Sequence, residues 1–312
     1  MSISYHISRQ QKSISLLLVA DAAHGQYNTI TKGLRGAHME FTKMHGLGND
    51  FIIVEDNGRR TDWNALASKL CERRLSVGAD GLMVVMPSSA ADIKMRIFNA
   101  DGSEAEMCGN GIRCFAKYVY ERGIVNKLEM TVETLAGIMR PGLKIKKGKV
   151  TEVSVDMGQP SFDRADIPMT GEGRPFDVDI EAAGRKVTVS ALLMGVPHTV
   201  VLTEDVDAIE AELLGPAIEH HAIFPRRTNV NFVQIIDSAN IRVRTWERGA
   251  GLTLACGTGA CASVVAMNKK GLISKKATAH LAAGRLIIEY LDDGRVFMTG
   301  PAQEVYRAVL LE

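Results

Sequence analysis

The sequence lacks several features that would assign it to a particular class of protein. It has no excess of charge, since 37 lysine and arginine residues stand against 36 aspartate and glutamate residues. Neither nucleic acid nor an anionic membrane is therefore expected as a partner. It also lacks the roughly 20 consecutive apolar residues that span a bilayer, because the longest apolar run near its start covers only residues 14–20. A small molecule is the expected partner.

Cysteine is scarce, and its pattern bears on the cellular compartment. The five cysteines are an odd number without the spacing of a disulfide framework, which favours the reducing cytoplasm over secretion. Arg9, Lys12 and the apolar run at 14–20 faintly resemble a signal peptide, but that run is at the lower limit of length. Organised sequence begins at residue 39. Residues 1–38 are predicted to be an extension outside the fold.

The residues that are present are typical of a soluble globular protein, with 46% hydrophobic and 23% charged side chains. A length of 312 residues is enough for two domains of medium size. Alternating apolar residues at 93–97 predict a strand, and Asp62 is predicted to cap a helix that runs through Leu66 and Leu70. This mixture of strands and helices favours the α+β class.

An internal repeat is the most informative feature of the chain. The pattern C-G-x-G occurs at Cys108 and again at Cys256, each time followed by a segment with helical character. The first segment has apolar residues at helical spacing, and the second is small or apolar on every side, which predicts a buried helix. Two similar domains are therefore expected, with a boundary in residues 151–158. Each cysteine is predicted to lie at a helix N-terminus.

A cysteine at a helix N-terminus is suited to proton transfer, because the helix dipole stabilises a thiolate there. The glycines allow close approach of a ligand, and unpaired backbone amides can bind an anionic group. The amides expected to converge on such a group are those of Gly109, Asn110, Gly257 and Thr258. Two opposed thiols could invert a carbon centre, one acting as base and the other as acid. The residues alone do not say which cysteine is the base.

The cysteines are also compatible with other roles. Cys71, Cys114 and Cys261 fit the role of small buried hydrophobic residues, and the same role is open for Cys108 and Cys256. A zinc site is disfavoured because no C-x2-C pair occurs, and C-G-x-G lacks the lysine of a phosphate-binding loop. No lysine motif indicates pyridoxal phosphate. A thiol redox protein stays open as an alternative.

Five segments of the sequence are more specific than the C-G-x-G repeat alone. They are residues 43–51 (KMHGLGNDF), 98–103 (FNADGS), 108–111 (CGNG), 247–251 (ERGAG) and 255–259 (ACGTG). On these segments the sequence, from residue 39 onward, resembles the diaminopimelate epimerase family. The resemblance implies conversion of LL-diaminopimelate to the meso form, a step toward lysine and peptidoglycan precursors, without a metal or an organic cofactor.

The resemblance also implies an architecture. Two pseudo-symmetric domains are expected, each a curled mixed or antiparallel sheet around a central helix, with the active site in the cleft between them. The first domain would comprise residues 39–154 together with a returning C-terminal strand at 302–312, and the second residues 155–301. The oligomeric state is open, with a homodimer as one option.

The resemblance assigns roles to residues by their place in these motifs. Cys108 and Cys256 would be acid and base, assisted by His198 and Glu247. The substrate-binding residues would be Asn49, Asn99, Gly109, Asn110, Asn229, Glu247, Arg248, Gly257 and Thr258, with Arg248 binding the distal carboxylate.

Two departures from the family pattern concern substrate selectivity. Val196 stands where many members have asparagine, and Gly81 stands where some have glutamine. Because neither change involves the cysteines, they bear on substrate strictness and not on the type of reaction. A related racemase of another amino acid, such as histidine or a proline derivative, is the nearest alternative; Arg248, Asn99 and Asn229 argue against it.

Overall fold

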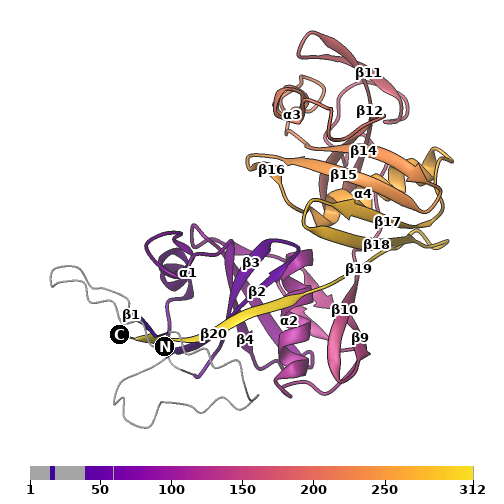
Figure 1. Ribbon diagram of the computed structural model, residues 1–312. Helices are drawn as coiled ribbons and strands as arrows, with labels where there is room; N and C mark the ends of the chain where they lie inside the picture. Colours follow the sequence, from indigo (N-terminus) through magenta and orange to yellow (C-terminus); the bar gives the residue numbers. More distant parts are fainter. Residues whose placement is uncertain (1–14, 18–38, 59, 312) are drawn as a thin grey trace.

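The computed structural model of the protein describes residues 15–17, 39–58 and 60–311. It has a two-domain α+β fold, in which sheets predominate and helices are few. Figure 1 shows one lobe built mainly from the first half of the chain and another built from the second half. Within the described part of the chain, no helix has the length and hydropathy of a membrane span.

The first lobe surrounds one buried helix, α2 (Gly109–Glu121). Its main sheet has the strand order β1-β20-β2-β3-β4-β5-β7-β8, with β6 added beside β5. The other elements of this lobe are β1 (Ser15–Leu17), β2 (Met39–Gly46), β3 (Asn49–Glu55), α1 (Trp63–Cys71), β4 (Gly81–Met86), β5 (Ile93–Asn99), β6 (Glu104–Ala105), β7 (Val132–Thr134), β8 (Gly137–Met139), β9 (Gly142–Lys146), β10 (Lys149–Asp156) and β20 (Gln303–Leu311).

The second lobe repeats this plan around α4 (Gly257–Lys269). Its sheet has the order β11-β12-β13-β14-β15-β17-β18-β19-β10-β9, with β16 added beside β15. The other elements are β11 (Val178–Ala182), β12 (Arg185–Met194), β13 (Val196–Leu202), α3 (Ala211–Glu219), β14 (Asn229–Asp237), β15 (Asn240–Glu247), β16 (Gly251–Thr253), β17 (Lys276–Leu281), β18 (Gly284–Tyr290) and β19 (Val296–Gly300).

The sequence patterns account for the central helices. The side chains of Ile112, Phe115 and Val119, which predicted α2 by their spacing, are all fully buried. In α4 the run from Gly259 to Met267 is buried on every side, so its small residues let strands pack around the whole helix. The shorter α1 begins where predicted, because Asp62 accepts the N–H of Ala65 at 3.1 Å.

Two strands, β10 and β19, connect the lobes. They pair antiparallel from Val153 opposite Gly300 to Asp156 opposite Phe297, while Val153 and Val155 also pack in the core around α2. After β19 the chain returns to the first lobe, where β20 pairs with β2. The predicted boundary between residues 154 and 155 falls inside β10, and the exact division of domains stays a prediction. Residues 1–38 lie outside the described residues, except that Ser15–Leu17 pairs with β20.

Candidate active site at two adjoining helix ends

Both repeated cysteines occupy the residue that caps a central helix. Cys108 has extended backbone angles and α2 begins with the next residue; its Sγ accepts the N–H of Gly111 at 3.4 Å. Cys256 has the same extended backbone before α4, but its sulfur makes no cap hydrogen bond. The prediction that each cysteine lies at a helix N-terminus is therefore confirmed.

The two helix ends adjoin one another. A β-carbon added to Gly109 would lie 3.2 Å from Cε of Met298, and one added to Gly257 would lie 2.9 Å from Sδ of the same methionine. The position of that added carbon on Gly257 is also 3.5 Å from Oδ1 of Asn110. Glycine at both first helical positions thus allows this close approach. The repeat brings the cysteine-bearing ends together, as a shared site requires.

Cys108 faces a polar group from the first sheet. In its thiol form it donates to Oδ1 of Asn49 at 3.7 Å, and the same oxygen accepts from Nδ2 of Asn110 at 3.3 Å. Asn49 is held in this orientation because its own Nδ2 donates to Asp80 at 2.7 Å. Burial raises the pKa of Cys108, whereas the backbone N–H groups of Gly111 and Asn110 and the charge of Arg113 act to lower it.

Cys256 lies among groups that favour the neutral thiol. Burial, followed by the charge of the Glu247 carboxylate and a hydrogen bond to it, raises the pKa of Cys256 to about 12. The hydroxyl of Thr258, 3.5 Å from the sulfur, acts in the opposite direction. Glu247 also raises the pKa of Cys108 through its charge. The structure therefore places Glu247 within electrostatic reach of both sulfurs.

His198 is fully buried in β13, and its protonation state follows from its partner Asn231. Nδ2 of Asn231 must donate to the carbonyl of Thr199, because a carbonyl cannot donate. That same Nδ2 lies 3.1 Å from Nδ1 of His198, so this ring nitrogen is the acceptor and Nε2 carries the proton. Burial, aided by the charge of Arg248, lowers the pKa of His198 to about 3. His198 is thus a neutral hydrogen-bond donor, and its Nε2 has no partner among residues 15–17, 39–58 and 60–311.

Asn229 and Arg248 come together at the ends of β14 and β15. Oδ1 of Asn229 accepts the backbone N–H of Arg248 at 2.7 Å, and the guanidinium of Arg248 donates to the carbonyl of Arg226 at 3.0 Å. Among the described residues, no carboxylate lies within ion-pair distance of this exposed guanidinium. It is therefore available for the carboxylate of a ligand.

Asn99 lies at the exposed end of β5. Its side-chain amide donates a hydrogen bond to Ser103, a near neighbour in the sequence, at 3.0 Å. Gly81 is opposite Asn99 in β4. A β-carbon there would lie 2.7 Å from the carbonyl oxygen of Phe98, which explains the glycine by packing. Val196 begins β13, two residues before His198, and is half-buried.

Sequence reasoning missed Asn231 and Arg113. Asn231 shares a strand face with Asn229, two residues away, and this spacing was the signal that could have revealed it. Within the described residues, no cluster of three or more His, Cys, Asp or Glu residues forms a metal site.

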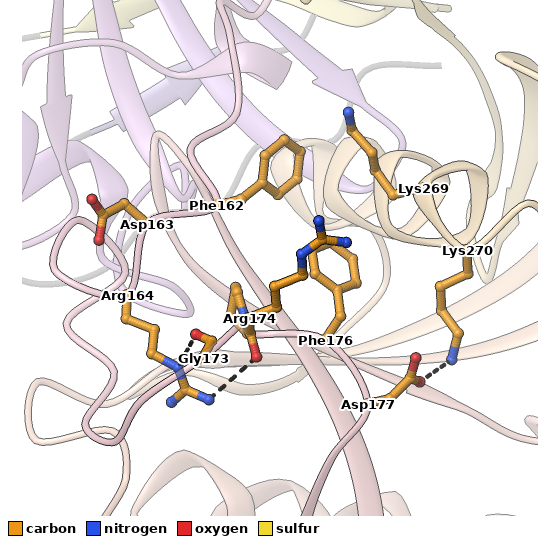
Figure 2. A pocket seen from close by; sticks show the side chains of 10 residues that line it. Phe162, Asp163, Arg164, Gly173, Arg174, Phe176, Asp177, Lys269 and Lys270 are labelled. Atoms are coloured by element: carbon orange, nitrogen blue, oxygen red, sulfur yellow. Dashed lines mark hydrogen bonds and ion pairs between the residues drawn. The ribbon is translucent and has the colours of Figure 1, made fainter.

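A hollow of about 1140 Å³ lies away from the two thiols, at the C-terminal end of α4 (Figure 2). Lys269 extends into this region with its ammonium 5.1 Å from the ring centre of Phe162, and Lys270 pairs with Asp177. Arg164 donates to the carbonyl of Gly173 at 2.9 Å and so orders the surrounding loop. The hollow contains no cysteine, and α4 separates it from Cys256 by roughly 18 Å of helix.

Comparison with known proteins agrees with this geometry. The family model described as diaminopimelate epimerase matches residues 41–162 and 190–305. A diaminopimelate epimerase from Pelotomaculum thermopropionicum is 52% identical over 272 residues, which cover 86% of this chain and 97% of that protein. One from Moorella thermoacetica is 52% identical over 273 residues, covering 86% and 98%.

Solved structures show the same fold at low identity. A PhzF-family phenazine biosynthesis protein from Bacillus anthracis has a TM-score of 0.66 and 18% identity, covering 89% of this chain and 100% of its own. A hydroxyproline epimerase from Agrobacterium vitis has a TM-score of 0.63 and 16% identity, covering 88% and 92%. Together with the sequence matches over most of its length, the paired helix ends leave one conclusion: this chain is a member of the diaminopimelate epimerase family.

Proposed function

We propose that this enzyme converts LL-2,6-diaminopimelate to the meso isomer by proton transfer between Cys108 and Cys256. The observation that carries the proposal is that two cysteines cap two adjoining helices, in a member of this family. A thiolate on one side takes the α-proton and becomes a thiol. The thiol on the other side gives its proton to the opposite face of the carbon and becomes a thiolate.

The backbone amides at the two helix ends supply the electrostatic support for this step. The N–H groups of Gly109, Asn110, Gly257 and Thr258 are the expected donors to the α-carboxylate, where negative charge develops as the proton leaves. His198 fits beside them as a neutral donor through its unpartnered Nε2. Glu247 fits as the acceptor for the α-ammonium group.

The distal end of the substrate accounts for the remaining polar residues. Arg248 is expected to bind the second carboxylate, since its guanidinium has no acidic partner among the described residues. Asn49, Asn99 and Asn229 would bind the distal ammonium and carboxylate groups. A site of this kind rejects amino acids that leave these groups unpaired, which disfavours histidine and proline derivatives as substrates.

The cellular setting is part of the proposal. All five cysteines are unpaired, and a site that needs two reduced thiols fits the reducing cytoplasm. The partner is a small molecule. Whether the enzyme acts as a homodimer is to be checked by light scattering of the purified protein.

Incubation with LL-diaminopimelate in deuterated water tests the proposed reaction. We expect meso-diaminopimelate that carries deuterium at one α-carbon, because the donated proton comes from a thiol that exchanges with solvent. Parallel incubations with L-proline, L-hydroxyproline and L-histidine serve as controls. If one of these amino acids is inverted and diaminopimelate is not, that amino acid is the substrate and the proposal of diaminopimelate is wrong. Absence of inversion for all of them would favour a redox role for the thiols.

A further inference from the structure

Arg113 is the largest fully buried side chain of the described residues, and its charge has no acidic partner there. It projects from the first turns of α2. Nη1 donates to the carbonyl of Gly109 at 3.3 Å and approaches Sδ of Met298 at 3.7 Å, while Nε donates to the carbonyl of Pro301 at 3.2 Å. Nη2 has no hydrogen-bond partner among the residues that the structure describes. Within the described part of the chain, the guanidinium is therefore held by neutral groups alone.

The other buried lysine and arginine side chains in the described ranges are neutralised. Lys43 pairs with Asp50 at 2.7 Å, and Lys117, one turn beyond Arg113 on α2, pairs with Glu121 at 2.9 Å. Placing a charge in the interior without a counter-ion is costly. Arginine nevertheless keeps its proton under such conditions. An unpaired cation in this position fits a site where an anion forms during function.

The backbone is shaped to hold this side chain. A β-carbon on Gly46 would lie 2.9 Å from Nη2, and one on Gly300 would lie 3.3 Å from Nε. Glycine at both positions leaves room for the guanidinium. Because Pro301 follows β19 and Gly109 follows Cys108, the hydrogen bonds of Arg113 join the crossover between lobes to the Cys108 helix end.

The ionisable groups around the guanidinium are thiols. Its charge acts most strongly on Cys114 and next on Cys108, both on α2, and then on Cys261 from α4. Burial raises the pKa of Cys114 to about 12 and also raises that of Cys261, and both are completely enclosed. Cys108 alone is partly exposed and receives backbone N–H donors. The acidic group that faces Cys108 is Glu247 from β15, which opposes ionisation.

We propose that Arg113 is the internal counter-ion of the two-thiol site and that it places the resting negative charge on Cys108, leaving Cys256 as the thiol. Arg113 is a positioning residue in this sense, since it acts through Cys108 and not on the substrate. The inference rests on the proposed function, which requires one thiolate and one thiol. It assigns the charge that the sequence left open.

Alkylation by iodoacetamide without substrate tests this assignment in the full-length protein. The rate at each cysteine is followed against pH by mass spectrometry of the modified peptides, because only the thiolate reacts. In the wild type, Cys108 should reach half its maximal rate at a lower pH than Cys256. In Arg113→Met this midpoint for Cys108 should rise by about one pH unit or more. Arg113→Lys, which keeps the charge, should restore most of the shift.

Lys117→Met is the matched control, since it removes a buried cation from the same helix that Glu121 already neutralises. It should lower the melting temperature without moving the midpoint of Cys108. An unchanged midpoint in Arg113→Met, or an equal shift in Lys117→Met, would overturn the inference. If Arg113→Met does not fold, the test is the order of the two pH midpoints in the wild type. A lower midpoint for Cys256 than for Cys108 refutes the assignment. Loss of the epimerase reaction with the alkylation pattern intact would instead count against the proposed function alone.

Discussion

The two central helix ends have the same backbone design but different surroundings for the sulfur. At α2, the sulfur of Cys108 accepts a backbone N–H and lies near the buried cation of Arg113. At α4, the backbone N–H of Gly259 acts to lower the pKa of Cys256 without forming a geometric cap hydrogen bond, and the carboxylate of Glu247 acts to raise it. Burial and Glu247 raise the pKa of both thiols, but only Cys108 has the charge of Arg113 acting to lower its pKa. In the proposed reaction, the symmetric geometry would supply the two faces, and this electrostatic difference would supply one acid and one base.

Removing one of the two sulfurs leaves a single thiol at the site and should have the largest effect on the rate of inversion. In Cys256→Ala, inversion should fall by on the order of 1,000-fold, because no acid remains on that face. Cys108 should still remove the α-proton of one isomer, so that isomer should acquire deuterium without changing configuration. Proton NMR in deuterated water, coupled to chiral chromatography, measures both quantities. Cys261→Ala, a buried cysteine on the same helix, is the control. Retention of inversion in Cys256→Ala would contradict the assignment.

Neutralising Glu247 weakens the difference between the two ends and should have an intermediate effect. The carboxylate raises the pKa of Cys256, which burial already raises, so Glu247→Gln should lower that pKa. Cys256 would then ionise over a lower pH range, and the enzyme would lose its acid as pH rises through that range. We expect kcat/KM to fall by roughly 100-fold near neutral pH. The pH midpoint of Cys256 alkylation should decrease in the same variant, and an increase would show that Glu247 does not act on this thiol.

Changing Asn231, the partner of His198, tests a further difference between the two helix ends, because His198 belongs to the lobe that contains Cys256. Asn231→Asp places an acceptor beside Nδ1, which should move the ring proton from Nε2 to Nδ1. We expect kcat/KM to fall about 10-fold and ¹⁵N NMR of the imidazole to report the exchanged tautomer. Thr245→Val is the control, because the Thr199 carbonyl still orients Asn231 when the hydroxyl at 3.0 Å is removed. An unchanged tautomer in Asn231→Asp would refute the role given to Asn231.

Local sequence signals predicted the parts of this molecule that depend on local chemistry. The helix starts at Cys108 and Cys256 followed from glycine-rich caps and from the apolar pattern after them, and the α+β class followed from the mixture of elements. Contacts between distant segments were not predictable in this way. The tautomer of His198 depends on Asn231 in a neighbouring strand, and the isolation of Arg113 depends on Pro301, far along the chain. The pairing of β10 with β19, which places a predicted boundary inside a shared strand, is likewise non-local.

The position of β20 affects the order in which the protein can fold as it is synthesised. In the first sheet this strand pairs with β2. The edge of β2 therefore stays unpaired until residues 303–311 have been synthesised. The second lobe, whose strands β11 to β19 are contiguous, can close earlier. A nascent chain therefore carries an open sheet edge, a template for unwanted pairing, while the ribosome completes most of the polypeptide. Loss of the final strand would damage the lobe that was translated first.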